Sequence, residues 1–350
     1  MIAARPVVRS SSMSSRYRNI FFFLGVAAVA VMLLTFDMSW SEVWLHVQRS
    51  GIWLPAAVLL WLVVYIMNAW AWQLIIDDPG PSGLSFWRVL KYTISGYAIN
   101  SVTPIGVLGG EPYRIMELTP YVGAARATSC VILYSMMHIF SHFVFWFFCL
   151  GAFVVMYFHS ITWSVALILL ATLAYCLLGI YFFMMGYRDG LAMRMLQLFG
   201  HLPLIGKRIR GLTERYGDSI RTVDEQIAAL HAQSPCTFYA SLLIEFLARM
   251  LGCLEYQFIF LIFNQYVGYW DCVIIQGVVS IFANLFFFMP MQMGSKEGGL
   301  AIVAKIMHMG GAYGVLVSLT TRLRELVWIA IGLALMRVGN EKKQNMDVPV

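Results

Sequence analysis

Six long apolar runs constrain the fold of this chain more than any other feature of its sequence. A helix needs roughly 20 residues to cross the hydrocarbon core of a bilayer, which is about 30 Å thick. Runs of about this length or longer occur at 19–36, 52–76, 128–158, 161–186, 238–263 and 314–338. Backbone groups inside a bilayer must be hydrogen-bonded within the protein, so we expect six transmembrane α-helices.

The composition agrees with an all-α polytopic membrane protein. Hydrophobic residues make up 60% of the 350 residues and charged residues only 12%. These values leave no room for a separate water-soluble domain of ordinary size. The formal net charge of +6 fits basic cytoplasmic segments, and the distribution of the charges gives no indication of nucleic-acid binding.

Basic segments predict the orientation and the boundaries of the membrane domain. Residues 1–18 form a basic tail, the transmembrane domain covers 19–338, and 187–235 and 339–350 are further polar segments. Because Lys and Arg concentrate in cytoplasmic loops, we place the N-terminus and both other polar segments in the cytoplasm. The loop 187–235 has apolar residues at helical spacing and is expected to form amphipathic helices on the inner leaflet.

Two segments interrupt the apolar pattern with helix-breaking residues and a glutamate. Each carries an asparagine, then a proline and glycines, and a glutamate seven positions after the proline. The residues are Asn100, Pro104, Gly110 and Glu111 in the first segment and Asn284, Pro290, Gly294 and Glu297 in the second. Irregular backbone at membrane depth is tolerated only where it is buried in protein or lines a wet cavity, so the pair predicts an internal polar site. Two ordinary interhelical loops are the alternative, which the recurrence of the spacing disfavours.

The segments 84–120 and 270–311, which contain these motifs, are expected to be re-entrant hairpins. About six full spans then remain, and the halves 19–158 and 161–338 have opposite orientations. This is an inverted repeat, as in many secondary transporters. A competing count treats hairpin arms as full crossings and gives about eight spans.

Charged residues inside the apolar segments are expected to face the protein interior and to be paired. A charge at the bilayer centre costs about 2.5–3.5 kcal/mol on insertion scales. The residues include Arg114, Glu245, Arg249, Glu255, Lys296, Arg322, Arg324 and Glu325. Glu245 and Arg249 are one helical turn apart and share a face. They are either structural ion pairs that hold helices together or, with the other arginines, a binding site for an anionic, phosphate-bearing lipid.

Residue types that often bind metals show no comparable pattern in the sequence. His138 and His142 are four residues apart, but no glutamate stands between them as in the HExxH motif, so a structural or proton-relay role is expected rather than zinc binding. The six cysteines are scattered singly and are interpreted as packing residues. We expect no metal, no cofactor and no ATP-hydrolysing module.

The two motifs together resemble a known family. Asn100-x3-Pro104 with Gly109-Gly110-Glu111-x2-Arg114, and Pro290-x3-Gly294-x2-Glu297-Gly298, are similar to the paired signatures of the lysylphosphatidylglycerol synthase transmembrane family of flippase-like bacterial inner-membrane proteins. The resemblance extends over nearly the whole hydrophobic chain. It implies movement of lipids such as aminoacylated phosphatidylglycerol between leaflets, with Glu111, Glu297 and Arg114 as cavity residues. Some members carry a cytosolic synthase domain, which this sequence lacks up to Val350, so the resemblance implies a stand-alone member and puts lipid synthesis in doubt.

Three classes of function remain open at this stage. In a lipid transporter, which is not an enzyme, the headgroup would cross through a charged cavity while the acyl chains stay in the bilayer. Arginines such as Arg114, Arg249, Arg322 or Arg324 would hold phosphate, and glutamates would receive an amine or a proton. A membrane-embedded enzyme would instead use Glu111 and Glu297 as acid and base on a lipid or polyprenyl phosphate. A lipid-binding scaffold subunit is the third class.

The expected partners are membrane lipids, and a homo-oligomer is left open. A glutamate in a desolvated cavity holds its proton more tightly than one in water. We therefore expect that Glu111 or Glu297 could couple lipid movement to protons.

Overall fold

The computed structural model describes residues 40–103, 109–189, 234–285, 299–300 and 311–338, together with the single residues 19, 23, 217 and 225. All regular secondary structure in these ranges is helical. The helices are α2 (Trp40–Arg49), α3 (Trp53–Asp77), α4 (Phe86–Val102), α5 (Gly110–Val122), α6 (Ala124–Tyr157), α7 (Trp163–Asp189), α10 (Pro235–Gly252), α11 (Leu254–Ile262), α12 (Tyr269–Leu285) and α14 (Gly311–Leu335), with a 3-10 turn at Phe158–Ser160. The prediction of an all-α chain is confirmed for these residues.

Four apolar stretches of the described chain are long enough to cross a membrane. They are Trp53–Asp77, Ala124–Tyr157, Trp163–Met184 and Pro235–Ile262. These stretches confirm the predicted runs at 52–76, 128–158, 161–186 and 238–263. The run at 314–338 corresponds to the 25-residue helix α14, which carries charges in its middle. The run at 19–36 lies outside the described residues except for Asn19 and Phe23, as does most of the loop 187–235.

The run at 238–263, predicted as a single helix, is divided into α10 and α11. Around Cys253 the backbone hydrogen bonds are of mixed type: Cys253 N donates to the carbonyls of both Arg249 and Met250, and Tyr256 N donates to the Cys253 carbonyl, all at 3.2 Å. The bonds that span three residues are those of a 3-10 turn, which often marks a hinge when it occurs inside a helix. The span therefore contains an interruption that the sequence analysis missed.

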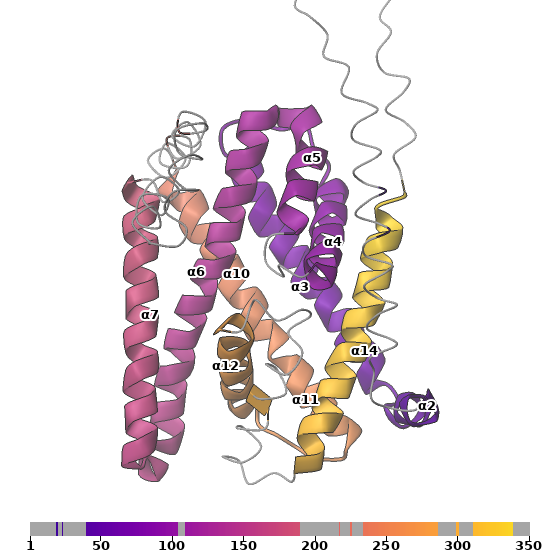
Figure 1. Ribbon diagram of the computed structural model, residues 1–350, viewed down its shortest axis with the longest axis vertical. Helices are drawn as coiled ribbons and strands as arrows, with labels where there is room; N and C mark the ends of the chain where they lie inside the picture. Colours follow the sequence, from indigo (N-terminus) through magenta and orange to yellow (C-terminus); the bar gives the residue numbers. More distant parts are fainter. Residues whose placement is uncertain are drawn as a thin grey trace, which may run out of the picture.

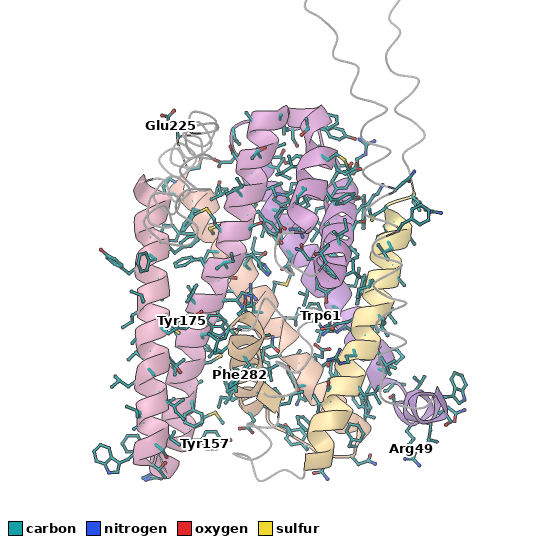
Figure 2. All side chains as sticks on the ribbon, viewed as in Figure 1. Arg49, Trp61, Tyr157, Tyr175, Glu225 and Phe282 are labelled. Atoms are coloured by element: carbon teal, nitrogen blue, oxygen red, sulfur yellow. The ribbon has the colours of Figure 1, made fainter. Side chains whose placement is uncertain are left out.

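The long helices form a bundle with short helices at both ends (Figure 1). α6 and α7 stand side by side at one edge and α14 at the other, while α3 and α10 run obliquely between them in contact with each other. α4 and α5 lie toward one end of the bundle, and α12 lies toward the opposite end. Arg49 on α2 and Tyr157 on α6 lie at the same end as α12 (Figure 2).

α4 and α5 form a closely packed pair of short helices. They contain 17 and 13 residues, so α5 is only about 20 Å long at 1.5 Å per residue. Glycine permits their close approach, because a Cβ at Gly110 would overlap the carbonyl oxygen of Gly96. The residues 104–108 between the helices, with Pro104, lie outside the described residues.

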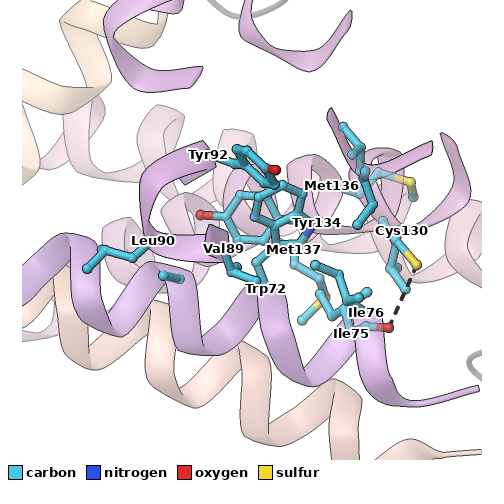
Figure 3. Close-up of a cluster of buried hydrophobic side chains, with 14 of the residues drawn as sticks. Trp72, Ile75, Ile76, Val89, Leu90, Tyr92, Cys130, Tyr134, Met136 and Met137 are labelled. Atoms are coloured by element: carbon cyan, nitrogen blue, oxygen red, sulfur yellow. Dashed lines mark hydrogen bonds between the residues drawn. The ribbon is translucent and has the colours of Figure 1, made fainter. Parts of the chain in front are cut away.

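The core joins α3, α4 and α6 through large side chains. Figure 3 shows Trp72 and Ile75 of α3 close to Tyr134 and Met137 of α6, and all four side chains are buried. In contrast, α7 is largely exposed, with Trp163 at 94%. Helix association in a membrane depends on such packing rather than on the hydrophobic effect, and an apolar exposed face is suited to lipid contact. The core thus holds α4, and with it α5, in a fixed position.

Candidate functional site

Glu111 lies in the first turn of α5 and accepts hydrogen bonds from three other side chains. Its Oε1 atom is 3.4 Å from Asn100 Nδ2, 3.5 Å from an Arg114 nitrogen and 3.4 Å from Ser135 Oγ. Asn100 also accepts a 2.6 Å hydrogen bond from the Gly110 N–H through its Oδ1 atom. The carboxylate is further stabilised by its position at a helix N-terminus, where the helix dipole favours negative charge. The structure thus brings together the predicted residues Asn100, Gly110, Glu111 and Arg114.

The contact with Ser135 shows how deep Glu111 lies in the bundle. Ser135 stands eleven residues after Ala124, the first residue of α6, which corresponds to about 17 Å along the helix axis. Glu111 Oε2 is buried and has no hydrogen-bond partner among the described residues. A buried carboxylate oxygen without a partner is energetically costly, so such atoms in native proteins call for an explanation.

Arg114 is held against two neighbouring aromatic rings next to Glu111. Its guanidinium carbon is 5.6 Å from the Trp72 ring centre and 5.4 Å from that of Tyr134, and the residue is 6% exposed. A Cβ at Gly96 would overlap its Nε atom, so this glycine makes room for the guanidinium. Cation–π contacts of this kind stabilise a desolvated cation by about 2 kcal/mol. Arg114 is therefore a buried cation whose one ion-pair partner among the described residues is Glu111, at 3.5 Å.

A second polar cluster joins α10 to the middle of α6. Glu245 Oε2 lies 2.9 Å from His138 Nδ1. Arg249 donates to Ser141 Oγ and to the backbone carbonyl of His138, both at 2.7 Å. Paired charges are expected here from the sequence. Within the described chain, the side-chain hydrogen bonds of both residues go to α6 and not to each other.

A third cluster joins α3, α11 and α14. Arg324 donates two hydrogen bonds to Glu255, at 2.8 and 2.9 Å, and Trp61 Nε1 donates to the same carboxylate at 2.8 Å. Glu325 Oε1 is 3.9 Å from Arg324. Trp61 is labelled in Figure 2, between α3 and α14. Glu255 neutralises Arg324 directly, which favours the structural alternative for this arginine over phosphate binding.

The second motif is described only at its start. Asn284 lies in the last turn of α12, where its Nδ2 atom donates to the Ser280 carbonyl at 2.8 Å. Ser280 in turn accepts a hydrogen bond from Trp146 Nε1 of α6. Pro290, Gly294, Lys296 and Glu297 lie outside the described residues, and Arg322 is partly buried on α14.

Five hydrogen-bonding residues of these clusters are absent from the predicted site. They are Trp61, Ser135, His138, Ser141 and Glu255. Glu255 is nevertheless among the charges expected to be buried and paired, and Arg324 pairs with it. His138 also carries a signal, as a titratable residue inside an apolar run. The two serines carry none, because serine is common in membrane helices and its partners lie far away in sequence.

Among the described residues, a hollow of about 480 Å³ lies at the end of α3, and Glu111 is not part of its lining. The hollow is lined by Trp70, Gln73, Leu74, Asp77, Asp78, Phe86 and Thr237. Within the described ranges, no three His, Cys, Asp or Glu side chains are grouped to hold a metal ion.

Comparisons with known proteins identify the family. Neither the search of curated proteins nor the search of solved structures gave a match to this chain. A family model described as "Lysylphosphatidylglycerol synthase TM region" matches residues 22–332, which is most of the chain and contains all three polar clusters. The resemblance seen in the two motifs is thereby confirmed, and the chain belongs to the lysylphosphatidylglycerol synthase TM region family.

Proposed function

We propose that this protein is a flippase-like transporter that moves a phospholipid, or another anionic or aminoacylated lipid, between the leaflets of a membrane. Membership of a family named for the membrane region of a lipid synthase supports a role connected with membrane lipids. The observation that carries the proposal is the partly buried Glu111, whose buried Oε2 atom is unpartnered among the described residues and whose Oε1 atom contacts Ser135, about 17 Å along α6. Such a costly group inside a bilayer is explained by a function.

The proposal includes two re-entrant hairpins related by an inverted repeat. α4 and α12 both contain 17 residues, and Asn100 and Asn284 both stand in the last turn before a proline-containing segment. α4 and α12 lie toward opposite ends of the bundle (Figure 1). These observations support two half-helices that enter from opposite sides, as in many secondary transporters. We further propose a bacterial inner-membrane location with the N-terminus in the cytoplasm.

Glu111 and Arg114 supply complementary charges for a lipid headgroup. A headgroup phosphate would compete with Glu111 for the Arg114 guanidinium, which is well suited to bind phosphate. A headgroup amine would bind the free oxygen of Glu111. Arg324 is assigned a structural role in this scheme, because Glu255 already occupies its guanidinium. The acyl chains would remain in the lipid, so only the polar headgroup needs the protein.

The proposal is tested by leaflet exchange in liposomes that contain the purified protein and fluorescent anionic or zwitterionic lipids. Glu111→Gln should reduce the exchange rate at least tenfold. Glu117→Gln is the matched control, since Glu117 is also buried on α5 but lies away from the Asn100 contact. Equal exchange in the Glu111→Gln variant and the unmodified protein would overturn the proposal. Formation of a new lipid product by mass spectrometry without exchange would instead indicate an enzyme.

A further inference from the structure

Glu245 and His138 form a carboxylate–imidazole pair inside the bundle, separate from the Glu111 cluster. Glu245 is 1% exposed, and its Oε2 atom is 2.9 Å from His138 Nδ1. Its other oxygen, Oε1, is buried without a hydrogen-bond partner among the described residues. His138 lies close to the middle of the 34-residue helix α6. Imidazole is the side chain that most readily gains and loses a proton near neutral pH.

Arg249 balances the charge of Glu245 without occupying its carboxylate. Its guanidinium binds Ser141 Oγ and the His138 carbonyl, so it fixes the α6 backbone next to the imidazole. With a neutral imidazole, the charges of Glu245 and Arg249 cancel. A proton on His138 leaves the cluster with one positive charge. In an interior of low dielectric constant, this change has a strong effect on neighbouring charged groups.

The two partners differ in access, as a proton-binding site requires. The His138 side chain is 40% exposed, whereas that of Glu245 is 1% exposed. The imidazole is therefore the more accessible partner, while the carboxylate beside it stays shielded. Glu111 is less suited to this role, because three side chains, one of them an arginine, already donate to its Oε1 atom.

α6 connects this pair to the Glu111 cluster. Ser135, which binds Glu111, stands one helical turn before His138. The Tyr134 ring lies 6.2 Å from the His138 ring and also faces Arg114. The titratable and charged groups beside the pair are Arg249 of α10 and Tyr134 and His142 of α6. Glu111 and Arg114 of α5 lie one contact further away, against Ser135 and Tyr134, and Trp72 of α3 packs against Tyr134.

We propose that Glu245 and His138 form a proton-binding site through which the protein couples lipid movement to a proton gradient. The coupling part rests on the proposed transport function. The binding part does not, because protonation of the pair can be measured on the purified protein. Helix α6 connects the proton-binding pair to the Glu111 cluster, because it carries both His138 and Ser135, which contacts Glu111.

Proton binding is tested by NMR of the protein in liposomes with ¹⁵N-labelled histidine. In the unmodified protein the ring resonances of His138, assigned by their loss in His138→Gln, should change between pH 8 and pH 5. The change should move to lower pH in Glu245→Gln, because the carboxylate that stabilises the protonated ring is lost, and should stay in place in the control His142→Gln, whose imidazole is the next one along α6. A His138 resonance that does not titrate, or that titrates equally in Glu245→Gln, would overturn the site.

Coupling is tested by leaflet exchange with and without an imposed pH difference across the liposome membrane. The ratio of the two rates should be at least threefold in the unmodified protein and in His142→Gln, and close to one in His138→Gln. A ratio near one in the unmodified protein would overturn the coupling. Complete absence of exchange would overturn the transport function and the coupling with it, and the NMR result would still decide whether the pair binds a proton.

Discussion

Arg324 of α14 binds Glu255 of α11 with two hydrogen bonds of 2.8 and 2.9 Å, and its guanidinium carbon lies 4.0 Å from the centre of the Trp61 ring on α3. Arg324 and Glu255 are both buried, at 4% and 3% exposure. The ion pair and the Trp61 ring therefore link three helices, and each of the two buried charges is neutralised by the other. This relationship leads to the first of four predictions.

Arg324→Ala should reduce the free energy of unfolding by about 3–5 kcal/mol, because it leaves Glu255 as an uncompensated buried charge. Thermal unfolding in detergent provides the measurement. The double variant Arg324→Met/Glu255→Leu should recover most of the loss, since both charges are removed together. Arg49→Gln is the control, because Arg49 is exposed on α2. This variant should unfold at the same temperature as the unmodified protein. No recovery in the double variant would contradict this account.

Gly110→Ala should separate α4 from α5. The added Cβ would overlap the Gly96 carbonyl, and backbone cannot move aside as a side chain can. We expect a loss of about 1–3 kcal/mol in stability and a reduced leaflet-exchange rate. Gly151→Ala on α6 is the matched control, since nothing lies within 4 Å of its added Cβ. That control should be stabilised by about 0.5–1 kcal/mol, because alanine favours the helix. Equal behaviour of the two variants would refute the close contact.

Asn100→Asp should place a second carboxylate beside Glu111. The acceptor for the Gly110 N–H remains, but the amide that donates to Glu111 is lost and repulsion replaces it. We expect a fall in thermal stability, which the additional substitution Glu111→Gln should largely reverse. The two single variants and the double variant form a double-mutant cycle. An interaction energy close to zero in the cycle would show that the two side chains are not coupled.

Thiol labelling should distinguish the two sides of the membrane. Cys236, in the first turn of α10, is exposed, whereas the other five cysteines are buried. If the loop before α10 is cytoplasmic, a membrane-impermeant maleimide should label Cys236 in inside-out vesicles and not in intact cells. Cys236→Ser should abolish the labelling under native conditions. Labelling in intact cells would reverse the proposed orientation.

The transmembrane helices could be predicted because length and hydropathy are physical requirements of a bilayer. The run predicted at 52–76 and helix α3 differ by a single residue at each end. The Glu111 cluster could be predicted in part, since a carboxylate among helix breakers in apolar sequence is costly unless it has a function. The interruption at Cys253 could not, because no proline accompanies it and Gly252 is tolerated in helices.

The partners of the buried charges could not be predicted from spacing. Glu245 and Arg249 stand at the spacing of a local ion pair, but His138, which is 107 residues away in sequence, binds Glu245 instead. Glu255 and Arg324 are likewise 69 residues apart. Such pairs depend on how far each helix is rotated when it packs, and this rotation is set by large neighbours such as Trp72 and Tyr134.

The 3-10 turn at Cys253 has a mechanical consequence for the span that contains it. Its hydrogen bonds have poorer geometry than those of the α-helices on either side, so bending of the span will concentrate there. Glu245 stands before this point and Glu255 after it. The segment with Glu255 is anchored to α14, and the segment with Glu245 is anchored to α6, so a change of tilt between the two would be taken up at Cys253.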